Sequence, residues 1–265
     1  MSDTYEVFAV KYAHHGPRSA AMNFIGGDPH QDSHALDFYV WAVVGKDRTV
    51  IVDTGFDEAM AKKRERQIMK PVAEALKMAG IAPDKVSDVV ITHLHYDHSG
   101  NYDAFPNARY HLQDCEMDFA TGRCMCDEKM RVAFEADDVT ALVRKVYAGR
   151  VTYHDGEDQV APGITVHHIG GHSKGLQAVR VKTARGDVVL ASDAIHLYEH
   201  LETDKVFPIT YNAEDAVKGY AKLRKLAPSL KHIVPGHDPK VLERYPSPNA
   251  ALKGWVARLD VEPSA

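Results

Sequence analysis

The stretch that decides the fold is residues 92–98, "THLHYDH", which holds three histidines and one aspartate. It follows directly on the apolar run "VSDVVI" (86–91), which predicts a buried strand. His93 and His95 alternate along extended chain, so their side chains can converge on one ion. Asp97 and His98 lie past the turn and suit a second ion. The stretch therefore predicts half of a metal site.

Three later strand ends supply the other half. His172 in "GGHS", Asp193 in "ASDA" and His237 in "PGHD" each follow an apolar run, at 164–169, 187–192 and 232–235. In α/β sheets, ligands bind beyond the carboxyl ends of the strands. Four strand ends thus offer five imidazoles and two carboxylates. This donor set predicts two divalent metal ions per chain, with zinc preferred and manganese, iron or cobalt also compatible.

Composition favours an ordinary cytosolic globular protein. The chain has 265 residues, 45% hydrophobic and 26% charged, with a formal net charge of −5. An acidic balance gives no global field that would attract nucleic acid or an anionic membrane surface. No apolar run approaches the ~20 residues of a membrane span, and the N-terminus lacks the pattern of a signal peptide. We therefore expect a cytoplasmic protein with a small-molecule substrate and neither a nucleic-acid nor a membrane partner.

Strands and helices are interleaved along the chain, which predicts one layered α/β domain over residues 1–265 with its helices outside. Strands are expected at 5–13, 38–45, 49–55, 86–92, 108–112, 164–169, 176–183, 187–192 and 232–235. Helices are expected at 57–67, 72–80, 113–120, 136–148, 213–227 and 249–260. Residues 14–37 are rich in Gly, Pro, Asp and His, which predicts a long loop.

The motifs "VDTG" (52–55), HxHxDHxG (93–100) and "PGHD" (235–238) resemble those of the metallo-β-lactamase superfamily. The resemblance spans most of the chain and implies a four-layer αββα sandwich with the metals at the edge of two facing sheets. It implies that Asp193 bridges the ions and that Asp53 supports a ligand histidine from behind. The ligand sets that it implies are His93, His95 and His172 for one ion, and Asp97, His98 and His237 for the other.

Within that superfamily the chain looks most like the N-acyl homoserine lactone hydrolases, through "IVDTGF", "THLHYDHSGN" and "GGHSKGLQAV". The resemblance implies opening of a lactone or similar cyclic ester by a metal-bridging hydroxide, and a role in quorum quenching. Those lactonases carry a tyrosine three residues after the bridging aspartate, where this chain has His196. His196 or Tyr198 is then expected to steady the carbonyl oxygen, and Asp97 or Asp193 to shuttle the proton.

Apolar residues outside the motifs are candidates for the walls of the substrate pocket. Met22 and Phe24 lie in the predicted loop, and Phe207 and Tyr211 lie in "KVFPITYN" (205–212). An apolar pocket would fit a moderately hydrophobic cyclic ester, although a core role for Phe207 and Tyr211 is equally compatible with the sequence. The long loop and the resemblance together suggest a homodimer.

Other activities remain open from the sequence. The same ligand set fits a glyoxalase II-type thioesterase, although no basic cluster dedicated to a glutathione carboxylate is evident. A mononuclear iron persulfide dioxygenase would leave Asp97, His98 and His237 without a full metal. Nucleic-acid processing is disfavoured by the acidic charge. A sensor without chemistry should have lost ligands, and none is missing.

Overall fold

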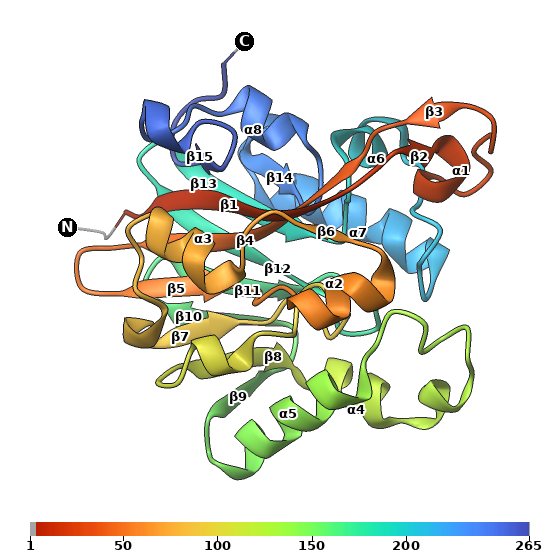
Figure 1. Ribbon diagram of the computed structural model, residues 1–265, viewed down its shortest axis with the longest axis horizontal. Coiled ribbons are helices and arrows are strands. Elements are labelled where there is room, and N and C mark those ends of the chain that lie inside the picture. Colours follow the sequence, from red (N-terminus) through yellow and green to blue (C-terminus); the bar gives the residue numbers. More distant parts are fainter. Residues whose placement is uncertain (1–3, 265) are drawn as a thin grey trace.

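Two facing β-sheets form the centre of the computed structural model, which describes residues 4–264 (Figure 1). The larger sheet has the order β15-β1-β4-β5-β7-β8-β9, with β6 pairing with β1. Its strands are β1 (Glu6–His15), β4 (Leu36–Val44), β5 (Thr49–Val52), β6 (Gln67–Ile68), β7 (Asp88–Val90), β8 (Arg109–Gln113), β9 (Val151–His154) and β15 (Val256–Arg258).

The smaller sheet has the order β10-β11-β12-β13-β14. Its strands are β10 (Glu157–Ala161), β11 (Ile164–His168), β12 (Gln177–Thr183), β13 (Gly186–Ser192) and β14 (Ile233–Pro235). Strands β5, β7, β8 and β9 run parallel, as do β13 and β14. Each sheet therefore has an edge at which parallel strands end together.

Helices cover the outer faces of both sheets. The helices are α1 (Ala20–Asn23), α2 (Glu58–Arg64), α3 (Val72–Met78), α4 (Asp114–Thr121), α5 (Ala136–Tyr147), α6 (Tyr198–Thr203), α7 (Ala213–Leu226) and α8 (Lys240–Arg244). Helices α2 to α5 contribute apolar residues to one cluster with the larger sheet, and α7 packs Tyr220 and Leu223 on the smaller sheet. The predicted αββα sandwich is confirmed.

The core between the sheets is built from alternate residues of both. Trp41 and Val52 of the larger sheet pack in one cluster with Val179 and Leu190 of the smaller sheet, and all four are fully buried. Strand β4 is buried along nearly its whole length because helices cover its other face. Such two-sided burial explains why its sequence reads as a continuous apolar run.

Two of the expected elements are wrong. Residues 249–260 do not form a helix: a short 3-10 turn at Ala250–Leu252 is followed by β15, which pairs with β1. Gly254, at φ +82°, ends the turn in a left-handed conformation that stops a helix. The loop expected at 14–37 is shorter, because β1 continues to His15 and the segment contains α1, β2 (Arg18–Ser19) and β3 (Asp32–Ser33).

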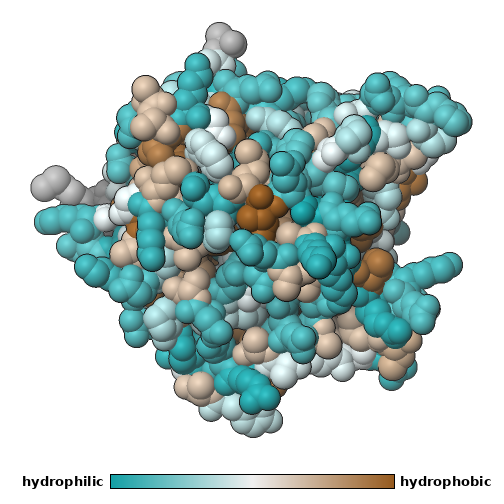
Figure 2. Space-filling view, viewed as in Figure 1, coloured by the Kyte–Doolittle hydropathy of each residue, from teal (hydrophilic) through white to brown (hydrophobic). Residues whose placement is uncertain are grey.

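The face of the molecule in Figure 2 has, among its described residues, no large continuous apolar area of the kind found at membrane or subunit interfaces. Figure 2 shows a largely hydrophilic face with small, separate apolar areas. None of the helices within residues 4–264 is long and apolar enough to cross a bilayer. All three cysteines are free thiols. The homodimer stays a prediction.

Candidate metal centre

All seven predicted ligand side chains meet at one end of the sandwich. Residues 93–98 follow β7, Asp193 follows β13, His237 follows β14, and His172 lies in the turn after β11. Their ligand atoms form two groups, within each of which all atoms lie within 4.8 Å of one another. The groups are His93, His95 and His172, and Asp97, His98, Asp193 and His237.

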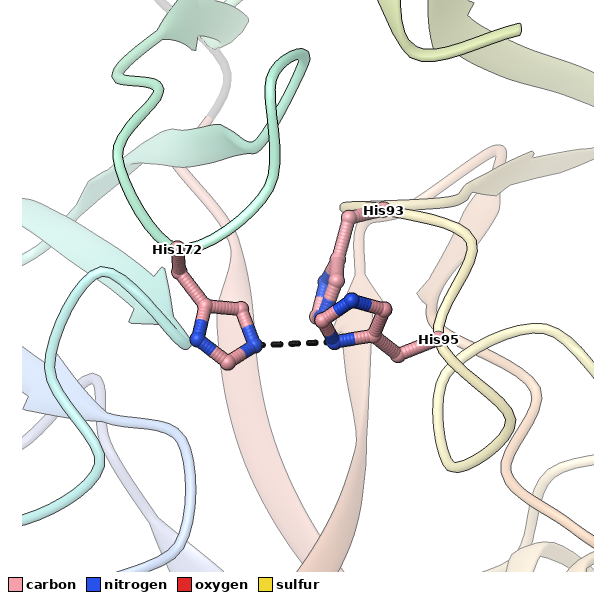
Figure 3. A group of neighbouring side chains, drawn as sticks. All are labelled: His93, His95 and His172. Atoms are coloured by element: carbon pink, nitrogen blue, oxygen red, sulfur yellow. Dashed lines mark hydrogen bonds between the residues drawn. The ribbon is translucent and has the colours of Figure 1, made fainter. Parts of the chain in front are cut away.

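The three histidines of the first group turn their rings toward a common point (Figure 3). His172 Nε2 lies 2.9 Å from His95 Nδ1, and the ring of His93 lies 4.5 Å from that of His95 between centroids. All three side chains are buried. Because His93 and His95 come from one sheet and His172 from the other, this group forms only where the sheets meet.

The carboxylate of Asp193 lies between the two groups. Its Oδ2 is 3.2 Å from His172 Nε2 and 3.9 Å from His93 Nε2. Its Oδ1 is 2.9 Å from His237 Nε2 and 3.2 Å from His98 Nε2. One oxygen therefore faces each group, which is the arrangement that a bridging carboxylate needs.

Burial and neighbouring charges favour the metal-binding protonation states of His93 and Asp193. Burial lowers the pKa of His93 well below its usual value, and the nearby His98 and His95 lower it further. Burial would raise the pKa of Asp193, but His196 and His237 hold this pKa well below its ordinary value. Neutral imidazole and ionised carboxylate are the forms that bind divalent metals.

The polar atoms at the centre of the cluster test whether a metal fits. Nε2 of His93, Nε2 of His98 and Oδ1 of Asp193 are buried and have no hydrogen-bond partner among residues 4–264. A buried polar atom without a partner costs about 1–3 kcal/mol, so a run of them at one spot is unfavourable unless a cation binds there. Imidazole and carboxylate donors suit divalent transition metals.

Asp53 supports the second group, as the resemblance implied. Its Oδ2 accepts a hydrogen bond from His98 Nδ1 at 2.7 Å, and its carboxylate also accepts from the backbone and hydroxyl of Thr92 at 2.7 and 2.9 Å. The Nδ1 proton on His98 leaves Nε2 as the lone-pair nitrogen facing Asp193. Asp53 itself has φ 64°, a left-handed conformation for a non-glycine residue, at the end of β5.

Glu116, which the sequence analysis did not single out, joins the two ligand loops of the first group. Its Oε1 accepts the backbone N–H of Leu94 at 2.9 Å, and its Oε2 accepts the N–H of Gly175 at 2.7 Å and the hydroxyl of Ser173. Leu94 stands between two ligand histidines, and Ser173 follows His172. Glu116 is fully buried in α4. An acidic residue in a helix carries no sequence signal for this role.

His196 lies against the cluster, whereas Tyr198 does not. His196 Nε2 is 3.0 Å from Asp193 Oδ2, and its ring stacks on Phe207 with 3.5 Å between centroids. The ring of Tyr198 packs in the core between the sheets, under the guanidinium of Arg244 at 3.8 Å. The loop after Asp193 therefore turns His196 toward the ligands and Tyr198 away from them.

A cavity of about 80 Å³ opens over the ligands, lined among others by Asp97, His196 and Phe207. It adjoins a second hollow of about 240 Å³, to which Tyr211 and Phe134 contribute. Phe24 is buried behind Phe207 in a small apolar cluster, and Met22 is exposed and lines neither space. Of the four expected wall residues, Phe207 and Tyr211 thus face the cavities.

Fold and site define a layered α/β protein with a histidine and aspartate metal centre between two sheets. The chain belongs to the Metallo-beta-lactamase superfamily, whose family model matches residues 38–237. It is accordingly a metal-binding protein.

Similar proteins include lactonases. The N-acyl homoserine lactonase AiiA of Bacillus thuringiensis subsp. kurstaki is 27% identical over 221 residues, 77% of this chain and 82% of that protein. The N-acyl homoserine lactonase AttM of Azorhizobium caulinodans is 30% identical over 173 residues, 62% of either chain. The crystal structure of a quorum-quenching N-acyl homoserine lactone lactonase aligns with a TM-score of 0.75 and 22% identity, covering 90% of this chain and 94% of that one.

Proposed function

We propose that this protein is a metal-dependent lactonase, which hydrolyses the ester bond of a lactone ring at a centre of two divalent ions. The observation that carries the proposal is the position of the Asp193 carboxylate, with one oxygen toward each group of ligands. The resemblance to lactonases over 77% of the chain supports the substrate class.

Seven side chains would hold the ions. One ion would be bound by His93, His95 and His172, the other by Asp97, His98 and His237, and Asp193 would be shared by both ions. We expect zinc, because imidazole predominates in the set; manganese, iron and cobalt tolerate the same donors. Two such ions, when bound, polarise an ester carbonyl and lower the pKa of bound water toward ~7.

Two side chains have the positions to assist the reaction. Asp97 lines the cavity, and its Oδ2 lies 3.6 Å from His98 Nε2 and 3.7 Å from His237 Nε2. It can accept the proton lost by the water that adds to the carbonyl carbon and return this proton to the ring oxygen when the C–O bond breaks. His196 can donate a hydrogen bond to the carbonyl oxygen, and Phe207, stacked on its ring, holds it in place.

The cavities indicate the shape of the substrate. About 80 Å³ over the ligands accommodates a small ring rather than a large polycyclic ester. The adjoining hollow of about 240 Å³ carries Phe119, Met130, Phe134 and Ile209, which suits an apolar substituent. We therefore expect a lactone that bears one apolar side chain.

Metal analysis and a substrate panel test the proposal. We expect about two metal ions per chain and hydrolysis of lactones with short or medium acyl chains. Asp193→Ala should abolish turnover, and Asp97→Asn should lower kcat and weaken binding of the second ion. One iron per chain with sulfite production from a persulfide, or cleavage of thioesters but not of lactones, would refute the lactonase assignment.

A further inference from the structure

The wall of the metal cavity carries an arginine, Arg66, that forms no ion pair with any acidic residue among residues 4–264. Arg66 and His15 line the cavity together with Asp97 and His196. Pairing of His14 with Gln67 places His15, the last residue of β1, beside Arg66. Arg18, in β2, approaches His15 from the other side. Arg66 is 51 positions from His15 in sequence, which explains why no basic cluster was evident there.

His15 lies between two hydrogen-bond donors and can satisfy only one. Its Nδ1 is 2.8 Å from Arg18 Nη1, and its Nε2 is 3.2 Å from Arg66 Nη1. A neutral imidazole has one acceptor nitrogen and one N–H, and an imidazolium has no acceptor. At least one guanidinium N–H therefore faces another N–H, an arrangement that an anion between or beside the donors would relieve.

Neither guanidinium has a counter-ion within 4.0 Å among residues 4–264. Arg18 donates to the amide oxygen of Asn23 at 2.6 Å and to the carbonyl of Met22, both neutral. Arg66 donates from Nε to the hydroxyl of Tyr96 at 3.0 Å and from Nη1 to the carbonyl of Arg64 at 2.6 Å. Arg64, in contrast, is paired with Glu135. The positive charge of Arg18 and Arg66 is thus left uncompensated.

The contacts of Arg66 fix its plane and leave one end open. Its Nε and Nη1 are used, whereas no hydrogen bond of its Nη2 to any part of residues 4–264 is found. The pKa of Arg18 is lowered to about 10 by burial and by the charge of Arg66. That of His15 is lowered to about 4 by burial and by both arginines. Both shifts agree with an excess of positive charge around His15.

We propose that Arg66, supported by Arg18 and His15, forms an oxyanion subsite in the metal cavity that binds a carboxylate or phosphate group of the substrate. A guanidinium with free N–H groups is suited to either anion. The subsite rests on the proposed function, because it names the kind of lactone hydrolysed: one that bears a negative charge a short distance from the scissile ester.

Calorimetry on the zinc-loaded protein tests the subsite without turnover. The probes are glutarate, 4-phosphonobutyrate and monomethyl glutarate; each has one carboxylate that can reach the metals, and only the first two have a second anionic group. We expect at least one of the two dianions to bind about 10- to 100-fold more tightly than the monoester. A single hydrogen bond to a charged group contributes a factor of about this size. The tighter of the two identifies the preferred anion.

Arg66→Gln should reduce that ratio to about one, and Arg66→Lys, which retains charge without the planar fork, should leave an intermediate ratio. Arg109→Gln is the matched control: this exposed arginine at the start of β8 lies at the opposite end of the strand from the site and should leave the ratio unchanged. Equal binding of all three probes to the wild type, or an unchanged ratio in Arg66→Gln, would overturn the proposal.

A pair of lactones separates this proposal from the proposed function. The two share one ring and one acyl chain, which ends in a free carboxylate in one and in its methyl ester in the other. Hydrolysis of both with equal kcat/KM would retain the lactonase and refute the subsite. Hydrolysis of neither, together with an Arg66-dependent preference for the dianions, would refute the lactonase and retain the subsite's affinity for anions.

Discussion

Replacing Glu116 should weaken metal binding although this residue touches no metal. Its carboxylate accepts hydrogen bonds from Leu94, Ser173 and Gly175, so it fixes the spacing between the segment 93–95 and the turn that carries His172. Glu116→Ala removes both acceptor oxygens and thus all three hydrogen bonds at once. The two loops then lose their common anchor, and the first group of ligands loses the geometry in which its nitrogens converge.

The magnitude follows from those contacts. Each buried donor left without an acceptor costs about 1–3 kcal/mol, and part of this is recovered because burial raises the pKa of Glu116 and thus penalises its charge in the wild type. We expect the metal-free protein to lose roughly 3–5 kcal/mol in free energy of unfolding, the range for breaking a buried charged network. Loss of such a supporting contact lowers metal affinity about 10- to 100-fold.

Competition with a chelator measures the affinity, and urea unfolding of the metal-free protein measures the stability. Glu116→Gln keeps the shape and one acceptor oxygen, so its effects should lie between those of the wild type and Glu116→Ala. Glu74→Ala, at an exposed position of α3, is the control and should change neither quantity. Zinc affinity within twofold of the wild type in Glu116→Ala would refute the reasoning.

Three further predictions follow from particular contacts. Asp53→Asn removes the acceptor that orients His98 and should lower metal affinity about 10- to 100-fold in chelator competition; an unchanged affinity would contradict this role. Burial and nearby carboxylates raise the pKa of Asp138 from 3.8 to about 7, so the folded state disfavours its charge and loses stability as pH rises from about 4 to 7. Asp138→Asn should therefore raise Tm by a few degrees at pH 8 and less at pH 5; an equal gain at both would refute the shift. Gly171→Ala places a methyl group 2.5 Å from Ala216 Cα at φ +87° and should cost roughly 1–3 kcal/mol in urea unfolding; an unchanged free energy of unfolding would contradict this.

The clustering of the candidate metal ligands could be predicted because each follows a strand with a clear sequence pattern. The runs before His93, Asp193 and His237 are short, apolar and rich in valine and isoleucine, which marks buried strands. Parallel strands in one sheet end at the same edge, so Asp193 and His237, which follow the parallel strands β13 and β14, converge there; the packing of the two sheets brings His93 beside them.

The features that the sequence did not predict depend on tertiary contacts rather than on local sequence pattern. The stretch 249–260 has a helical pattern of apolar residues, but the edge of β1 offers backbone hydrogen bonds that Val256–Arg258 take instead. Tertiary pairing overrides such a local preference. Glu116, Arg18 and Arg66 were not predicted, because the role of each depends on contacts with residues that only the fold brings beside it. A single charged residue in a loop or helix is indistinguishable in sequence from a solvated one.

The spacing between the two groups of ligands depends on how the sheets pack. The hydroxyl of Thr92 lies 2.9 Å from Asp53 Oδ2 and 2.9 Å from the hydroxyl of Ser192. Asp53 ends a strand of the larger sheet and Ser192 ends a strand of the smaller sheet, and both have left-handed backbone, with φ 64° and 46°. Such conformations persist only where surrounding contacts hold them. Because Ser192 directly precedes Asp193, the contact through Thr92 fixes the Asp193 carboxylate relative to the sheet that precedes His93 and His95. Any substitution that shifts one sheet against the other should therefore alter both metal positions together rather than one alone.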